Sequence, residues 1–265
     1  MVLREHEDSV LCIPQSEHAR ISGQIAAAWG NERVPRAEPA AELALAAARH
    51  DIGMDAYDAE PELDPEAGLP RSFMTMPLEE HVRCWRRGPS LVVDEDPYAA
   101  ILVSLHGTTL MARKHASGEA ERELVADYLE TQEELRAGLR DQLSSDPHLA
   151  TYLEPDPIER GRRLLALWDA MSLGVCLPRL PQRLTDTPAG EPPVVLAMGY
   201  HGSGGGERGA EDPHAVTVDP WPFDTDEVHL WAEGRRLQGR FAEAEPMRAA
   251  LREAPRERLT IVLVR

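Results

Sequence analysis

The sequence of 265 residues is short of several features, and each shortage excludes a class of protein. No apolar run approaches the roughly 18 residues that a membrane-spanning helix needs. The first ten residues, MVLREHEDSV, carry charges throughout, so we expect no secretory signal peptide. The three cysteines are odd in number and far apart (Cys12, Cys84 and Cys176). They predict reduced thiols in a cytoplasmic protein rather than a disulfide framework.

Basic charge is also scarce. The chain has 28 basic and 46 acidic residues, a net charge of −18, and Lys114 is its one lysine. Such a charge repels nucleic acid and anionic lipid, so we expect neither as a partner. The expected partner is a small anionic or polar substrate, and the sequence leaves the oligomeric state open. The preference for arginine over lysine is typical of a GC-rich genome.

What the sequence has in quantity is helical periodicity. Apolar residues recur at steps of three and four through most of the first 180 residues. Proline at a first helical turn marks several starts. The pattern predicts helices from residue 16, from about residue 40 to a terminator at Gly53, from Pro77, from Asp96-Pro97, over 119–143 and from Asp156-Pro157. The acidic, proline-rich stretch 55–73 is expected to be a long loop of the kind that covers an active site.

After about residue 180 the pattern changes to short β-branched, apolar segments separated by turns, with one helix near 243–253. The start of the chain, residues 1–14, also looks like a strand pair. We therefore expect a mainly α fold, in which a helical bundle over 1–180 carries a small β-rich extension over 181–265. The N-terminal strand pair is a candidate to complete that extension.

A His-Asp pair stands at the end of the second expected helix, in AELALAAARHDIGMD. Chance alone supplies roughly 0.6 such pairs in a chain of this composition, so the pair proves little by itself. His50 could be a hydrogen-bonded histidine at a helix end, with Asp51 as a cap. The alternative is that both side chains bind a metal.

Four other polar residues lie on apolar helix stripes, and they favour the metal-binding alternative. His18, His81 and His106 each fall on a separate expected helix. Asp169, in LLALWDAMSL, is surrounded by leucine, tryptophan and methionine. A carboxylate in such surroundings costs several kcal/mol unless a cation or strong donors meet it. A metal is the simplest such cation.

The ordered set resembles the HD-domain superfamily, in which histidine, a His-Asp pair and a late aspartate on separate helices hold a metal. The resemblance covers about residues 15–175 and implies an HD-domain-like helical bundle. The presence of two additional histidines between the His-Asp pair and the last aspartate resembles the pattern of the dinuclear branches. These branches include certain cyclic-dinucleotide phosphodiesterases and mixed-valent di-iron oxygenases. The resemblance implies two divalent transition metals, Fe or Mn first, with Zn, Ni or Co as alternatives. One would be held by His18, His50, Asp51 and Asp169, and the other by Asp51, His81 and His106.

Two departures from the family pattern bear on function. Met54 stands where a lysine often follows the His-Asp pair, and His106 is followed by Gly107 rather than by a second histidine. The leading expectation is a hydrolase of small phosphoesters that uses a metal-bound hydroxide. The alternatives are a di-iron oxygenase acting on a small polar substrate and a non-catalytic, metal-stabilised interaction protein.

Three further residues are candidates to assist at the site. Asp55 and Tyr57 follow the His-Asp pair closely, and Arg20 follows His18. Each could lie behind the metal ligands or contact the substrate. Solvation of a loop or of an exposed helix face explains them as well.

Overall fold

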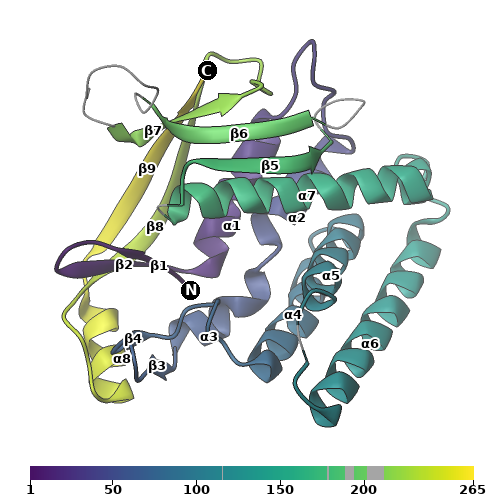
Figure 1. Cartoon of the computed structure of the whole chain (residues 1–265). Coiled ribbons are helices and arrows are strands. Elements are labelled where there is room, and N and C mark those ends of the chain that lie inside the picture. Colours follow the sequence, from purple (N-terminus) through teal and green to yellow (C-terminus); the bar gives the residue numbers. More distant parts are fainter. Residues whose placement is uncertain (115, 178, 189–193, 202–211) are drawn as a thin grey trace.

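A seven-stranded sheet and a set of helices make up the computed structural model, which describes residues 1–114, 116–177, 179–188, 194–201 and 212–265 (Figure 1). The strand order is β1-β2-β8-β9-β7-β6-β5. The strands are β1 (Val2–Glu5), β2 (Ser9–Ile13), β5 (Gln182–Thr187), β6 (Val194–His201), β7 (Asp212–Asp219), β8 (Glu227–Gln238) and β9 (Arg256–Val264).

The two ends of the chain meet in this sheet. β2 pairs antiparallel with the end of β8, where Val10 lies opposite Leu237. β9 lies between β8 and β7, antiparallel to the first and parallel to the second. It therefore joins the strands β1-β2-β8 to the strands β7-β6-β5.

The expectation of a mainly α fold is wrong. The sheet is a major layer of the molecule, so the fold is α+β rather than a helical bundle with a small extension. One reason is that β5, with the sequence QRLTDT, has no apolar alternation to reveal it. Another is that residues 1–14 and the C-terminal strands share the sheet. The division of the chain at residue 180 stays a prediction.

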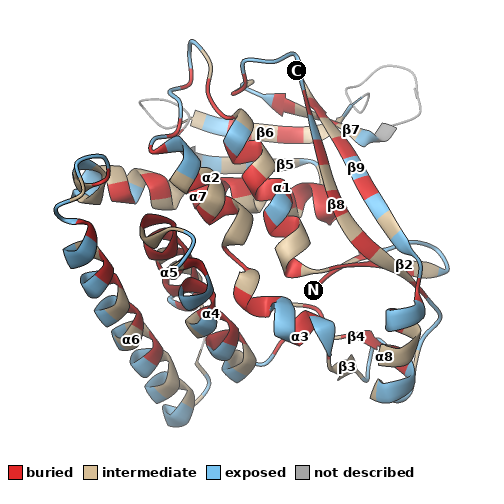
Figure 2. Ribbon diagram, turned by 180° about the vertical axis from the view of Figure 1, so that it is seen from behind, coloured by how far each residue is buried: buried red, intermediate tan, exposed pale blue. Residues whose placement is uncertain are grey.

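Helices α1 and α7 pack against the sheet, and α4, α5 and α6 extend beyond them (Figure 1). Helix α1 packs against α2, α7 and β8, and α5 packs against α2, α4, α6 and α7. Figure 2 shows α5 almost wholly buried and α6 with one exposed face. The helices are α1 (Gln15–Ala28), α2 (Ala40–Arg49), α3 (Asp55–Ala59), α4 (Leu78–Val92), α5 (Pro97–Met111), α6 (Glu119–Leu143), α7 (Pro155–Cys176) and α8 (Ala244–Glu253).

Several predicted helix boundaries are confirmed. α6 spans the expected residues, and α5 begins at Pro97 with Asp96 as its cap, whose side chain accepts a hydrogen bond from the Ala99 backbone N–H at 2.6 Å. The start of α7 was expected at Asp156-Pro157 but lies at Pro155. Proline in the first turn made the start of α5 predictable, and periodicity made α6 predictable.

Gly53 has a different role from the expected one. Helix α2 ends at Arg49, and Gly53 lies beyond it in a 3-10 turn (Ile52–Met54). A Cβ atom at Gly53 would lie 2.1 Å from the carbonyl oxygen of Cys84 on α4. Glycine is therefore required for the close approach of α4 to the turn that follows the His-Asp pair.

Helix α1 also covers an edge of the sheet. β2 pairs with only the last residues of β8, so on this edge the earlier backbone groups of β8 face no strand. Gln24 donates to the Trp231 carbonyl at 2.9 Å and accepts from the Trp231 N–H at 2.8 Å. Glu17 accepts from the Glu233 N–H at 2.9 Å. These side chains pair an otherwise open strand edge and fix α1 to the sheet.

The stretch 55–73 is not the plain loop that was expected. It contains α3 and a two-stranded ribbon of β3 (Leu63–Asp64) and β4 (Leu69–Pro70). Among the helices that the structure describes, none is long and apolar enough to cross a membrane.

Candidate metal centre

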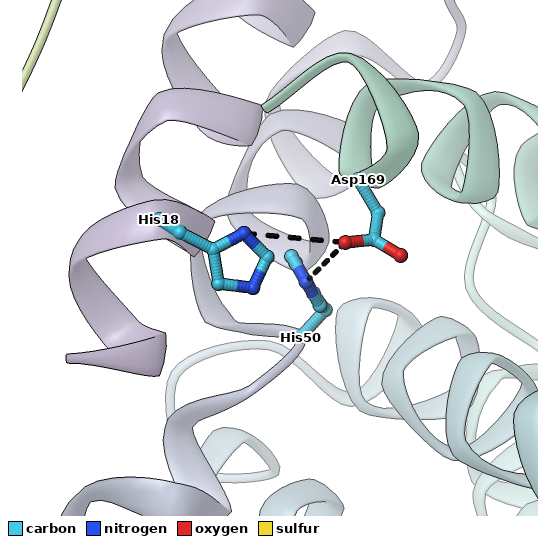
Figure 3. Close-up of side chains that lie close together, drawn as sticks. All are labelled: His18, His50 and Asp169. Carbon is cyan, nitrogen blue, oxygen red and sulfur yellow. Dashed lines mark ion pairs between the residues drawn. The ribbon is translucent and has the colours of Figure 1, made fainter. Parts of the chain in front are cut away.

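Five of the six residues predicted as metal ligands lie together between the helices. His18 is on α1, His50 and Asp51 follow the end of α2, His106 is on α5, and Asp169 is on α7. Figure 3 shows His18, His50 and Asp169 directed at one another from three separate elements. The four other than Asp169 are buried, and the Asp169 side chain is 13% exposed.

The ligand atoms form two overlapping groups. One contains His18, His50 and Asp169, the other contains His50, Asp51 and His106, and the atoms of each group lie within 4.8 Å of one another. His50 belongs to both. The residues come from distant parts of the sequence, so the fold rather than any local motif creates the cluster.

Hydrogen bonds outside the cluster fix the orientation of His18. The Ser172 hydroxyl donates to the Asp169 carbonyl at 2.9 Å, so its oxygen is left to accept from Nδ1–H of His18, which is 2.9 Å away. The proton of His18 is then on Nδ1 and the lone pair is on Nε2. That lone pair faces Oδ2 of Asp51 at 3.0 Å.

His50 is oriented in the same way, and His106 adds a third ring nitrogen to the cluster. Nδ1–H of His50 donates to the Ala47 carbonyl at 2.8 Å, which leaves the lone pair on Nε2. This Nε2 lies 3.4 Å from Asp169 Oδ1 and 3.6 Å from Asp51 Oδ2, and His106 Nε2 lies 3.6 Å from Asp169 Oδ2. Within the described residues, neither Nε2 has a hydrogen-bond partner.

Lone pairs of the imidazole nitrogens therefore face carboxylate oxygens. Because these groups repel one another, the arrangement needs a positive charge between them. In the metal-free protein a proton supplies it. Burial lowers the pKa of His50, but Asp51 and Asp169 outweigh burial and raise it to about 9. Burial raises the pKa of each aspartate, yet the neighbouring histidines hold both pKa values below the ordinary value. A divalent transition metal fits the same donors, because neutral imidazole and carboxylate are its usual ligands.

Further donors hold Asp51. The Gln15 amide donates to Oδ2 at 3.2 Å, and the Trp85 indole N–H lies 3.4 Å from Oδ1. The Gln15 backbone N–H in turn donates to Asp58 at 2.6 Å. Such outer partners orient metal ligands. Sequence reasoning missed Gln15 and Ser172, although each lies three residues from a predicted ligand and thus on the same helix face.

Comparison with known proteins places the chain in a family. A family model described as "Protein of unknown function (DUF3891)" matches residues 1–239. The chain belongs to the DUF3891 family. No curated protein and no solved structure matches it. The matched segment contains every residue of the cluster, although it ends before β9.

His81 occupies a separate position in this DUF3891 protein. It is buried on α4, but it is in neither ligand group of the described residues. Its Nδ1 accepts a hydrogen bond from Lys114 at 3.0 Å, and its ring lies 4.9 Å from the Trp85 ring. Burial and the Lys114 charge lower the pKa of His81 to about 4. His81 is therefore a neutral hydrogen-bond acceptor for the lysine.

The three candidates to assist at the site are dispersed. Arg20 pairs with Glu17 on the surface and lies over the Trp231 ring. Asp55 is exposed, whereas Tyr57 is buried in an apolar cluster that also contains Trp85. Tyr57 is therefore a core residue, and Arg20 belongs to the contact between α1 and the sheet.

Proposed function

We propose that this protein is a metal-dependent hydrolase that acts on a small phosphoester. The observation that carries the proposal is the convergence of three imidazole nitrogens on two carboxylates. In this arrangement His18 and His50 are oriented by Ser172 and by the Ala47 carbonyl so that their lone pairs face Asp51 and Asp169. A purely structural histidine cluster does not need its lone pairs directed at carboxylates.

The donor set gives each group a role. His18, His50, Asp51, His106 and Asp169 would hold one divalent metal, Fe or Mn first. When bound, such a metal lowers the pKa of water and neutralises charge on phosphoryl oxygens. Gln15 and Trp85 keep the Asp51 carboxylate in place. Hydrolysis forms a bond between phosphorus and a water oxygen, breaks the phosphorus–oxygen bond of the ester, and delivers the water proton to the leaving alcohol.

Hydrolysis is favoured over di-iron oxygenation by the position of His81. The oxygenases of the HD superfamily that the sequence resembles use two irons, and the second iron would need His81 as a ligand. Lys114 holds Nδ1 of His81 by a hydrogen bond of 3.0 Å, and His81 is in neither ligand group of the described residues. The second metal is therefore not part of the proposal.

We also propose that the protein is cytoplasmic, a compartment in which the buried thiols of Cys12, Cys84 and Cys176 stay reduced.

Metal content and phosphate release test the proposal together. The purified protein is loaded anaerobically with Fe(II) or Mn(II), desalted and assayed by elemental analysis. It is then incubated with a panel of phosphomonoesters and phosphodiesters. We expect about one metal per chain and release of phosphate or of a phosphomonoester from at least one substrate.

Variants sharpen this test. Asp51→Asn should lose both metal and activity, because its carboxylate is within 3.0 Å of His18 Nε2 and 3.6 Å of His50 Nε2. Asp55→Asn changes an exposed carboxylate four residues away and is the matched control. No bound metal after loading, or oxygen consumption without hydrolysis, would overturn the proposal.

A further inference from the structure

Lys114 is the one lysine among the 28 basic residues, and two of its neighbours, His81 and Trp85, lie on helix α4. It follows the end of α5, is half-buried, and donates to His81 Nδ1 at 3.0 Å. Its Nζ atom also lies 5.8 Å from the centre of the Trp85 ring. No carboxylate of the described residues forms an ion pair with it, although the chain has a large excess of acid.

Two neighbours connect Lys114 to the cluster. Trp85 lies under the ammonium group and directs its indole N–H at Asp51 Oδ1, 3.4 Å away. His81 is close enough to Asp51 for that carboxylate to act on its pKa. The ammonium group and Asp51 thus both contact the side chain of Trp85. The ammonium group binds the histidine that a second metal would have to use.

We propose that Lys114 supplies the second positive charge of the site and binds the phosphate group of the substrate beside a single metal. This inference rests on the proposed metal centre. An ammonium group is a compact charge with three N–H donors. One donor is used by His81, so the other two are left for phosphate oxygens.

The charge of the whole protein favours a local cation where an anionic substrate binds. A net charge of −18 repels an anionic substrate, and Asp51 and Asp169 add two carboxylates at the site itself. Lys114, which has no ion pair with a carboxylate in the part of the chain that the structure describes, offsets this repulsion where the phosphate would bind. Lysine presents this charge as a compact ammonium group, whereas arginine would present a planar guanidinium group.

Inorganic phosphate is the probe that tests the inference, because no substrate is identified. Wild-type protein and Lys114→Gln are loaded with Mn(II). Metal is measured by elemental analysis, and phosphate affinity is measured by isothermal titration calorimetry. We expect about one metal per chain in both proteins. The affinity for phosphate should fall at least about 10-fold in Lys114→Gln, as expected for loss of a charge-assisted hydrogen bond.

Two further variants control for charge and for folding. Arg113→Gln removes the same charge from the adjacent, exposed residue and should leave phosphate affinity unchanged. Lys114→Arg keeps the charge and should bind phosphate more tightly than Lys114→Gln.

Three results would overturn the inference. Two metals per wild-type chain, or equal phosphate affinity in wild type and Lys114→Gln, would overturn the role of Lys114 and leave the metal centre standing. No metal in the wild-type protein would remove the centre and the inference together.

Discussion

Replacing Asp169 by asparagine should remove most of the stability that the protein gains from a metal. Asparagine keeps the shape of the side chain but lacks the charge. The two carboxylate oxygens lie 3.4 Å from His50 Nε2 and 3.6 Å from His106 Nε2, so the change acts on the centre of the cluster. The helix that carries Asp169 should be little affected, because its packing comes from the surrounding apolar residues.

The size of the effect follows from binding linkage. A metal present at 100 times its dissociation constant stabilises the folded state by about 2.7 kcal/mol. For a chain of this length, about 1 kcal/mol corresponds to about 2–4 °C in melting temperature. Chelation should therefore lower the melting temperature of the wild-type protein by about 5–10 °C. If asparagine weakens binding about 100-fold, the same relation leaves about 0.4 kcal/mol, so the shift falls to about 1–2 °C.

Thermal melts of both proteins, followed by circular dichroism with and without EDTA, measure this difference. Asp55→Asn is the control for removal of a nearby exposed carboxylate and should respond to EDTA as the wild type does. Equal EDTA shifts in wild type and Asp169→Asn would refute the assignment of Asp169 as a ligand.

Three other perturbations have defined outcomes. Ser172→Ala removes the acceptor for His18 Nδ1–H and should weaken metal affinity about 10- to 100-fold, as measured by competition with a chelating dye. Gly53→Ala should destabilise the fold in urea denaturation because its Cβ would meet a carbonyl oxygen at 2.1 Å. Gly138→Ala, on an open face of α6, should stabilise it by about 0.5–1 kcal/mol. In metal-free protein the pKa of His50 is raised from 6.5 to about 9, so its contribution to stability is complete below pH 6.5 and disappears as the pH rises through 9. Melts between pH 6 and 10 should show this loss without metal, and a much smaller loss with metal bound.

Local signals made the helices predictable. Asp96-Pro97 and the apolar periodicity over 119–143 specify helix boundaries through capping and periodicity, and the structure has α5 and α6 at these positions. The sheet could not be predicted in the same way, because strand pairing joins residues such as Val10 and Leu237, far apart in sequence. Periodicity identifies a strand but not its neighbour.

The candidate site was predictable for a related reason. A histidine or aspartate on an apolar helix stripe is conspicuous in a sequence, and three of the four such residues meet the His50-Asp51 pair in the structure. That they bind a metal stays a prediction. The pairing of His81 with Lys114 was not readable, because Lys114 lies outside any helix, where no periodicity indicates which way a side chain points.

The position of β9 has a consequence for when the sheet can form as the chain is synthesised. Every other strand and helix described here precedes β9 in the sequence, yet β9 lies between β8 and β7 and joins the two parts of the sheet. During synthesis, the hairpin of β1 and β2 and the helices emerge long before the strand that unites them. We therefore expect the sheet to close only after residues 256–264 have been translated. Folding should accordingly be slow, as is usual when contacts join distant parts of a chain.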